Sequence, residues 1–406
     1  MTGIIIHYII AAIGQLSLYE IVALDINPFI KIRYRTIGID LVPSLNGIQV
    51  MKMWKKLKYK HSFRTGICAQ LFILITLSYQ FMIIDWHNHF YPDPYIKGLA
   101  KESTYAKVEK DKQDRLLVHY EGDYNIVVGP HIDIEERLKG MDKAGIDIHV
   151  LTLTTPSVER EKPETGKKLA QLANDGYRDI IEKYPERFTA LAALPLQTPK
   201  AAAEELERAV TDLGLRGGTL MSNINGKPLD SKDLSPVYEQ AVKLDVPLYI
   251  HPTSPINSKA MEDYRLVPIL GFGVDTSLAI LRLVFSGTLE KYPKLKLVAS
   301  HLGGVYPYLR GRIETGYNAY PECKVNISNP PNHYLKKLYM DSIIYDNDVL
   351  MSSIAFCGAE KIVLGSDDPH QIGDIEQAVE RIKQLEISDQ DKQLILGENA
   401  KKLLKL

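Results

Sequence analysis

The chain has 406 residues, of which 45% are hydrophobic and 24% are charged, and its formal net charge is −1. This balance is ordinary for a soluble globular protein and gives no bulk electrostatic reason to expect a nucleic-acid partner. The three cysteines stand far apart without a C-x-x-C pair, which argues against a disulfide framework or a thiolate zinc site and favours a reducing, cytoplasmic location.

The first 81 residues differ in charge from the rest of the chain. They carry nine Lys or Arg and three Asp or Glu, whereas residues 82–406 carry 40 basic and 47 acidic residues. Their basic run KMWKKLKYKHSFR precedes the apolar run GICAQLFILITLSYQ, an order that resembles a signal anchor. Because Ile83 and Ile84 are needed for the next predicted strand, the apolar run is short for a membrane span.

Three interpretations of residues 1–81 are open. The favoured one is that the natural chain begins at Met82 and that the preceding residues are upstream sequence translated in error. The second is an irregular N-terminal extension, and the third, least favoured, is a membrane anchor, so a membrane partner is not expected. In each case the folded domain of interest comprises residues 82–406.

From Met82 onward, short apolar runs alternate with amphipathic stretches. The predicted strands are Ile83–Trp86, Ile146–Leu153, Phe188–Leu194, Leu215–Met221, Pro247–His251, Leu295–His301, Leu338–Ser342 and Lys361–Ser366. The predicted helices are Ile134–Ala144, Gly166–Lys183, Pro199–Leu213, Leu234–Leu244, Ser277–Lys291, Tyr306–Tyr317, Asp346–Cys357 and Asp374–Leu385. This alternation indicates a parallel sheet, and eight such strands favour a closed (β/α)8 TIM barrel of the α/β class.

The stretch Lys97–Pro130 interrupts this pattern. It is polar and shows little periodicity. We expect a long excursion after the first strand, in a place where such barrels carry lids or substrate loops.

Histidines and one aspartate recur where predicted strands end. His87 and His89 close the first strand in MIIDWHNHFYP, and their i, i+2 spacing points both to one face. His251 closes the fifth strand in LYIHP, His301 closes the sixth in LVASHLGG, and Asp367 follows the eighth in IVLGSDDP. The carboxyl ends of barrel strands are where such enzymes assemble their sites. Three imidazoles and one carboxylate satisfy a divalent, zinc-like ion and leave a position for water.

Two absences limit the expected cofactors. Binuclear hydrolytic barrels often bridge two metals through a modified lysine that closes the fourth strand, but here that strand reads LRGGTLMSN without a lysine at its end. A single metal ion is therefore expected. The sequence also has no phosphate loop and no nucleotide fingerprint, so no organic cofactor is expected.

The motifs on these elements resemble one known family. They are MIIDWHNHFYP, RLKGMDKAGIDIHVLT, ANDGYRDIIEKYPERFTALAALPLQ, LYIHP, EKYPKLKLVASHLGGVYPYLRGRI, YMDS, IVLGSDDPH and LGENAKKLL. In this order they cover nearly all of residues 82–406 and resemble the amidohydrolase superfamily (amidohydrolase family 2), in its aminocarboxymuconate-semialdehyde decarboxylase-like branch. The resemblance implies a TIM barrel of the metal-dependent hydrolase type.

The resemblance also implies roles for the clustered residues. The implied ligands of one divalent ion, zinc or alternatively manganese, are His87, His89, His251 and Asp367. His301 is implied to be the catalytic acid/base beside the metal rather than a permanent ligand, because imidazole moves protons near neutral pH. Asp367 is also implied to act in catalysis, by orienting a water molecule or shuttling its proton.

Substrate-binding residues follow from the same comparison of motifs. Arg312 resembles an arginine that members of this branch present to a substrate carboxylate in the neighbouring subunit, which implies a homodimer. A second family arginine falls near Gly129, where this chain has none; His131 and Arg137 are the candidates to replace it, although Arg137 fits its helix better. His370 stands where an aromatic residue is usual, which implies a more polar pocket.

The predicted reaction is the loss of CO₂ from an unsaturated or aromatic carboxylate, with a proton delivered to the carbon that bears the carboxylate with the help of His301. Two other reactions are open at the same site, namely hydrolysis of an amide, ester or lactone and hydration of a conjugated dicarboxylate. A barrel that binds a metal or small ligand without turnover is the remaining alternative. The product distinguishes these reactions, because CO₂ is released only in the first.

Overall fold

The computed structural model describes residues 19–21, 34–36, 81–255 and 257–406. The chain divides into two compact units, Met1–Gln80 and Phe81–Leu406. In the first unit, β1 (Tyr19–Ile21) pairs antiparallel with β2 (Tyr34–Thr36). The basic and apolar runs that suggested a signal anchor lie outside the described residues.

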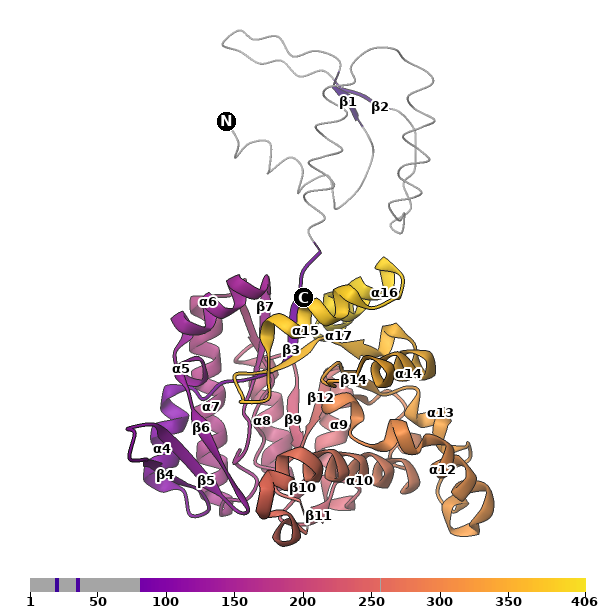
Figure 1. Ribbon diagram of the computed structural model, residues 1–406, viewed down its shortest axis with the longest axis horizontal. Coiled ribbons are helices and arrows are strands. Elements are labelled where there is room, and N and C mark those ends of the chain that lie inside the picture. The colour runs from indigo at the N-terminus through magenta and orange to yellow at the C-terminus, as the bar shows by residue number, and fades with distance from the viewer. Residues whose placement is uncertain (1–18, 22–33, 37–80, 256) are drawn as a thin grey trace. The chain divides into compact units, whose positions relative to one another are not determined.

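Parallel strands close into a barrel in the second unit (Figure 1). In order around the barrel they are β3 (Ile84–His89), β7 (Ile148–Thr152), β8 (Phe188–Ala190), β9 (Gly218–Met221), β12 (Pro247–His251), β13 (Lys296–Ala299), β14 (Tyr339–Asp341), β15 (Ile362–Val363) and β16 (Gly365–Asp368). A bridge between Ala192 and Gly218 joins β8 to β9. The eighth position is shared, because β15 pairs with β14 and β16 pairs with β3. The predicted (β/α)8 barrel is confirmed.

Helices follow the strands as the sequence periodicity predicts. Those on the barrel are α6 (Ile134–Ala144), α7 (Pro163–Lys183), α8 (Pro199–Thr211), α9 (Ser235–Leu244), α10 (Phe272–Phe285), α12 (Tyr306–Ala319), α14 (Asn347–Cys357) and α15 (Ile375–Gln384). Shorter ones are α11 (Thr288–Lys291), α13 (Pro331–Leu335), α16 (Asp389–Gln393) and α17 (Asn399–Leu404). The helix predicted over Ser277–Lys291 is wrong in its bounds, because Gly287 adopts a left-handed φ of 78° and separates α10 from α11.

The excursion after the first strand is more ordered than its polar sequence suggested. It contains α4 (Asp93–Glu102), an antiparallel sheet of β4 (Lys107–Lys110), β5 (Leu116–Tyr120) and β6 (Asp123–Val127), and α5 (Gly129–Ile132). Ser254, in the loop after β12, donates a 2.8 Å hydrogen bond from Oγ to the carbonyl oxygen of Glu121, and Tyr105 lies 3.3 Å from the same hydroxyl. The excursion is therefore attached to a loop at the carboxyl end of the barrel.

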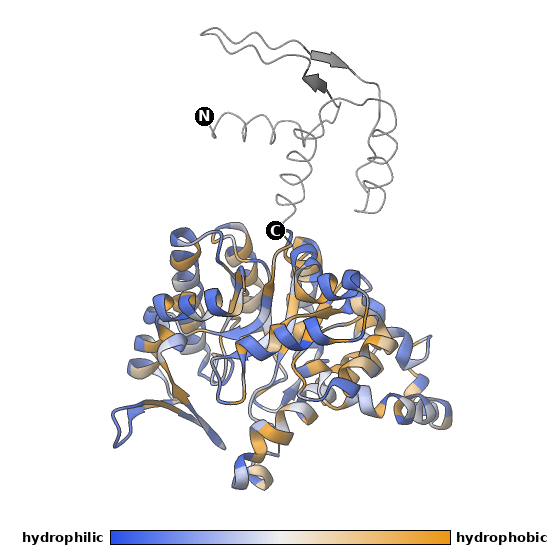
Figure 2. Cartoon of the chain, turned by 45° about the horizontal axis from the view of Figure 1, so that its top comes forward, coloured by the Kyte–Doolittle hydropathy of each residue, from blue (hydrophilic) through white to orange (hydrophobic). Residues whose placement is uncertain are grey.

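The barrel has an apolar core and a separate buried polar region. Apolar residues concentrate on the strands and inner helix faces, and hydrophilic residues on the outer helix faces (Figure 2). A second apolar cluster contains Ile84 and Trp86 of β3 together with Leu403 and Leu404 of α17. The next residues along β3 are polar and fully buried, so the polar lining begins within this strand.

One helical run within the described part of the chain, Asp263–Phe285, is long and apolar enough to cross a membrane by length and composition alone. Half of its most apolar window is buried in the protein. The buried side includes Ile280, Leu283 and Val284 of α10, which belong to the main core. The core helix of a globular domain passes the same test of length and composition.

Candidate metal centre and active site

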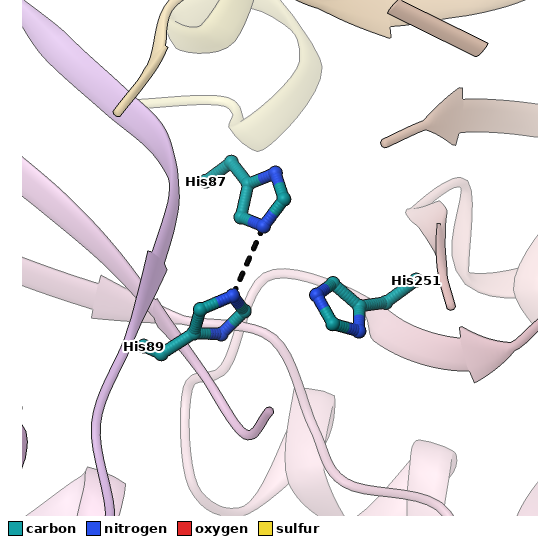
Figure 3. A group of neighbouring side chains, drawn as sticks. All are labelled: His87, His89 and His251. Carbon is teal, nitrogen blue, oxygen red and sulfur yellow. Dashed lines mark hydrogen bonds between the residues drawn. The ribbon is translucent and has the colours of Figure 1, made fainter. Parts of the chain in front are cut away.

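Histidines from two strands meet at the carboxyl end of the barrel. His87 and His89 lie on β3 and His251 is the last residue of β12, and all three side chains are buried. Their rings point toward one another (Figure 3), with ring centroids 4.8 Å apart for His87 and His89 and 4.7 Å apart for His89 and His251. The i, i+2 spacing on β3 thus brings both imidazoles to one point, as predicted.

Asp367 of β16 completes this cluster. Its Oδ1 atom lies 3.4 Å from Nε2 of His87 and 3.3 Å from Nε2 of His89. Burial alone would raise the pKa of Asp367, but the surrounding imidazoles of His301, His89 and His87 hold it well below its usual range. Asp367 is therefore an anionic ligand candidate among neutral nitrogen donors.

Hydrogen bonds fix the tautomer of each imidazole. Nδ1 of His87 donates to Oδ2 of Asp341 at 2.6 Å, and Nδ1 of His251 donates to the carbonyl oxygen of Pro252 at 2.9 Å. Nδ1 of His89 lies 3.2 Å from Oγ1 of Thr152, whose own hydrogen goes to the carbonyl oxygen of Asn88. These contacts place the proton of each ring on Nδ1 and leave a lone pair on Nε2.

The donor set fits a divalent cation. The Nε2 atoms of His87 and His89 lie only 3.0 Å apart, and no proton remains to join them. Burial, together with the charges of neighbouring imidazoles, lowers the pKa of His89 and of His251 well below the usual value, so neither ring carries a charge. Converging lone pairs beside a carboxylate repel one another without a cation, and the set of three imidazoles and one carboxylate suits zinc or manganese.

Asp341 is the site residue that the sequence motifs did not assign. It ends β14 in the YMDS motif and is fully buried. Besides His87, its carboxylate accepts hydrogen bonds from the hydroxyl of Tyr249 at 3.0 Å and from the backbone N–H of Leu302 at 3.2 Å. Asp341 therefore holds one metal-ligand candidate and the turn that carries His301. The sequence signal that could have identified Asp341 was its position at the end of the seventh predicted strand.

His301 lies at the edge of the cluster. It follows β13, and both His301 and Leu302 adopt left-handed backbone angles, with φ of 50° and 52°. Its side chain is 20% exposed, and Nε2 lies 3.7 Å from Oδ2 of Asp367. Burial would lower the pKa of His301, but the neighbouring carboxylate of Asp367 outweighs it and raises the pKa. This arrangement suits a group that holds and moves a proton.

The residues predicted to bind substrate fall in different places. His370 lies beside the cluster, with its ring centroid 4.9 Å from that of His89, and the ring of His131 lies 5.2 Å from that of His370. Arg312 is an exposed residue of α12, and within the described part of the chain no hydrogen bond or ion pair joins it to the cluster. One chain alone therefore brings His370 and His131, but not Arg312, to the candidate site.

Arg137 does not fill the place of the missing arginine. It is buried on α6, and all five of its N–H donors face protein acceptors. These acceptors are the carbonyl oxygens of Pro130 and His89, Oδ1 of Asn88 and Nδ1 of His149. Because no N–H remains free, Arg137 supports the backbone of β3 rather than a substrate.

Comparisons with known proteins agree with this geometry. A family model described as amidohydrolase matches residues 84–406. The 2-amino-3-carboxymuconate-6-semialdehyde decarboxylase of Dictyostelium discoideum is 32% identical over 331 residues, which cover 80% of this chain and 91% of that protein. The crystal structure of 5-carboxyvanillate decarboxylase from Sphingomonas paucimobilis superposes with a TM-score of 0.71 at 26% identity, over 80% of this chain and 100% of that one.

A third relative has been solved with a metal. The dihydroxybenzoic acid decarboxylase of a Polaromonas species, with bound manganese and the inhibitor 2-nitroresorcinol, superposes with a TM-score of 0.66 at 28% identity. That comparison covers 80% of this chain and 97% of the other. The resemblance to the decarboxylase branch that the motifs indicated is thereby confirmed. Because the family match runs from β3 to α17 and spans the whole barrel, the chain belongs to the amidohydrolase family.

Proposed function

We propose that the protein is a metal-dependent carboxy-lyase that releases CO₂ from an unsaturated or aromatic carboxylate. The observation that carries this proposal is the convergence of three Nε2 lone pairs and Asp367 beside His301, a proton-holding group at the open edge of the cluster. Relatives with the same barrel are decarboxylases of such carboxylates. The proposed metal ligands are His87, His89, His251 and Asp367.

A divalent ion, when bound, supplies the positive charge that holds a carboxylate oxygen and a water molecule. The chain's own residues supply the proton. Nε2 of His301 delivers it to the carbon that bears the carboxylate, and Asp367, 3.7 Å away, keeps the imidazole protonated until transfer. The bond to the carboxyl carbon then breaks, its electron pair restores the unsaturated system, and CO₂ leaves without an oxidant or an organic cofactor.

We propose zinc as the resident ion, with manganese as the alternative. Three imidazoles and one carboxylate are a usual zinc set, whereas the solved Polaromonas relative holds manganese. Elemental analysis of the protein purified without added metal separates the two, and activity after reloading with each ion shows which one supports turnover.

We also propose that the protein works as a homodimer in which Arg312 reaches the partner's substrate. Two observations support this. Arg312 is exposed and unpaired within the described part of the chain. Large apolar side chains are exposed as well, with Tyr308 of the same helix 87% exposed and Ile269, in the turn before α10, 68% exposed. Exposed apolar side chains of this size are typical of a contact surface.

We propose a cytoplasmic location for the enzyme. The cysteines in the described part of the chain, Cys323 and Cys357, form no disulfide, as expected in a reducing compartment. The proposed partners are small carboxylates and a second copy of the chain. Nothing in the net charge of −1 favours nucleic acid.

The test of the proposed function is the release of labelled CO₂ by the metal-loaded full chain from a panel of carboxylated muconates and hydroxybenzoates. We expect His301→Asn to keep the metal and lose at least a hundredfold in turnover, because proton transfer by a positioned side chain contributes about that much. His251→Ala should instead lose the metal. Addition of water without CO₂ release would identify a hydrolase or hydratase, and full activity of His301→Asn would exclude the proton role.

A further inference from the structure

His131 carries a buried hydrogen-bonding atom that the proposed reaction leaves without a role. The residue lies in α5, at the end of the excursion, and is 1% exposed. Among the residues that the structure describes, Nε2 of His131 has no hydrogen-bond partner. A buried polar atom without a partner costs on the order of 1–3 kcal/mol, so a fold retains one where something else completes it.

The chemical state of this ring is set by its other nitrogen. Nδ1 of His131 accepts a hydrogen bond from the backbone N–H of Val128 at 3.1 Å. A nitrogen that accepts a hydrogen bond carries no proton, so in the neutral ring the hydrogen sits on Nε2. Burial, together with the charges of His370 and Arg137, lowers the pKa of His131 well below its usual value. Nε2 is thus an uncharged N–H donor, and a metal ion is excluded there because no lone pair is available.

The ring is also held in place. It stacks on Tyr91, with centroids 5.7 Å apart and an interplanar angle of 19°. The hydroxyl of Tyr91 in turn donates to the carbonyl oxygen of Thr155 at 2.7 Å, and it accepts a hydrogen bond from the side-chain amide of Asn125 at 2.9 Å. Because Nδ1 is tied to the backbone at Val128, the donor at the far end of the ring is fixed before any ligand arrives.

The ring of His131 is separated from the metal centre by a single imidazole. The ring of His370 lies between those of His131 and His89, 5.2 Å from the first and 4.9 Å from the second. Arg137, whose charge acts on His131, has no free N–H and lies 3.6 Å from the carboxylate of Asp368. Nε2–H of His131 is therefore an uncharged donor, and the nearby guanidinium of Arg137 is already bound to other protein groups.

We propose, as an extension of the proposed function, that Nε2–H of His131 binds an uncharged oxygen on the substrate, a ring hydroxyl or a carbonyl, next to the carboxylate that leaves. A second carboxylate is disfavoured at this position, because the described residues of the chain place no free cation beside Nε2 of His131 and burying an unpaired anion costs more than one neutral hydrogen bond returns. The substrate class is therefore a hydroxylated or carbonyl-bearing monocarboxylate rather than a dicarboxylate. His131 acts here as a specificity-determining residue, and His301 remains the acid/base.

The test measures binding of probes that cannot be decarboxylated, to the manganese-loaded full chain, by calorimetry. The probes are 2-nitroresorcinol, 2-nitrophenol, which lacks one hydroxyl, and 3-hydroxy-2-nitrobenzoate, in which a carboxylate replaces that hydroxyl. We expect the wild type to bind 2-nitroresorcinol about tenfold more tightly than either of the other two. Equal affinities, tighter binding of the carboxylated probe, or no binding of any probe would overturn the proposal.

Two variants separate a direct contact from a structural role. His131→Phe keeps the stacked ring but removes the donor, so the tenfold preference for the second hydroxyl should vanish while 2-nitrophenol binds as it does to the wild type. His131→Gln places an amide N–H near the position of Nε2 and should restore most of the preference. An equal loss for both probes in His131→Phe, with normal metal content, would show that the residue only supports the fold.

The outcome is independent of turnover. A hydroxyl preference that depends on His131, without CO₂ release from any carboxylate in the panel, would contradict the proposed function but support this inference. CO₂ release from dicarboxylates at the same rate as from hydroxybenzoates would contradict the inference but support the proposed function.

Discussion

At the scale of single residues, Asp341 controls the metal centre without being a ligand candidate. Its carboxylate fixes the Nδ1–H tautomer of His87 and also receives the backbone N–H that follows His301. Ligand orientation and acid/base position therefore depend on one buried anion. The imidazole of His87, which is hydrogen-bonded to Asp341, helps to hold the pKa of Asp341 below its usual value although burial raises it, which keeps the anion present at neutral pH.

We predict that Asp341→Asn lowers metal affinity by ten- to a hundredfold, the usual effect of removing such a supporting carboxylate. The reason is that an amide accepts from His87 less strongly and leaves its own N–H₂ group facing a donor. Competition with a chromogenic chelator measures the change. Tyr249→Phe is the matched control, because it removes one hydrogen bond to Asp341 and keeps the charge; an affinity in Asp341→Asn equal to that control would contradict the supporting role.

Glu159 gives a prediction on pH. It is fully buried and accepts a 3.0 Å hydrogen bond from Thr253, and burial raises its pKa to about 7 despite the charge of Arg160. Between about pH 4.5 and 7 the folded state keeps a proton that the unfolded state has released, so the free energy of unfolding falls as the pH rises through this window. The expected loss is on the order of 3 kcal/mol.

Chemical unfolding at pH 5 and pH 8 checks this sign. Glu159→Gln cannot titrate, and its stability should decline less between the two pH values than that of the wild type. Glu204→Gln, at an exposed position of α8, should decline as much as the wild type. The assignment to Glu159 would be refuted if the free energy of unfolding of the wild type and of both variants changed by the same amount between pH 5 and pH 8.

The residue scale also shows what the sequence could reveal of the site. His87, His89, His251, His301 and Asp367 were recognisable because each stands at a strand end, and the barrel brings such ends together. Asp341 also ends a predicted strand, but its contacts with His87 and Leu302, like the unpartnered nitrogen of His131, were not recognisable in this way. Their roles depend on which atoms face each other across neighbouring elements, and no spacing along the chain encodes that.

At the scale of elements, the periodic segments were predictable and the irregular ones were not. The helix over Ile134–Ala144 has its predicted bounds because Asp133 accepts hydrogen bonds from the N–H groups of Glu135 and Glu136 and Gly145 ends it with a φ of 71°. The small sheet of the excursion was missed because β4 reads KVEK, which is charged and only half-buried. β4 is a strand because it pairs with β5, not because its own sequence favours one.

Gly287 gives a prediction at this scale. It separates α10 from α11 with a left-handed φ, and a Cβ atom there would lie 2.4 Å from the carbonyl oxygen of Asn326. Gly287→Ala should therefore lower the free energy of unfolding by more than about 1 kcal/mol. Gly140→Ala in α6 is the matched control, since a Cβ atom there would meet no heavy atom within 4 Å outside its own neighbours in the helix, and it should stabilise by about 0.5–1 kcal/mol. Equal effects in denaturant titrations would refute the strain argument.

At the scale of the whole molecule, the proposed dimer predicts a response to charge on its apolar face. Leu278 and Val274 of α10 are both about two-fifths exposed, at 43% and 40%, on the same run of chain as Ile269. Leu278→Glu should convert a dimer to a monomer in light scattering and, because Arg312 would lose access to the partner's substrate, should raise KM more than it lowers kcat. Val128→Glu, at a 41% exposed position of the excursion, should leave the mass unchanged. A monomeric wild type would contradict the dimer.

The shared eighth strand has a consequence for how the protein folds during its synthesis. The barrel closes where β16 pairs with β3, and Ser366 binds Asp85 there through both its N–H at 3.1 Å and its hydroxyl at 2.6 Å, across a separation of 281 positions in the chain. The ligand candidates sit on both sides of this seam. A ribosome must therefore release nearly the whole barrel before a metal can be captured, and an ion, once bound, joins the earliest strand to the latest. Metal binding then marks the completion of folding. A chain that ends before β16 can neither close the barrel nor complete the metal site.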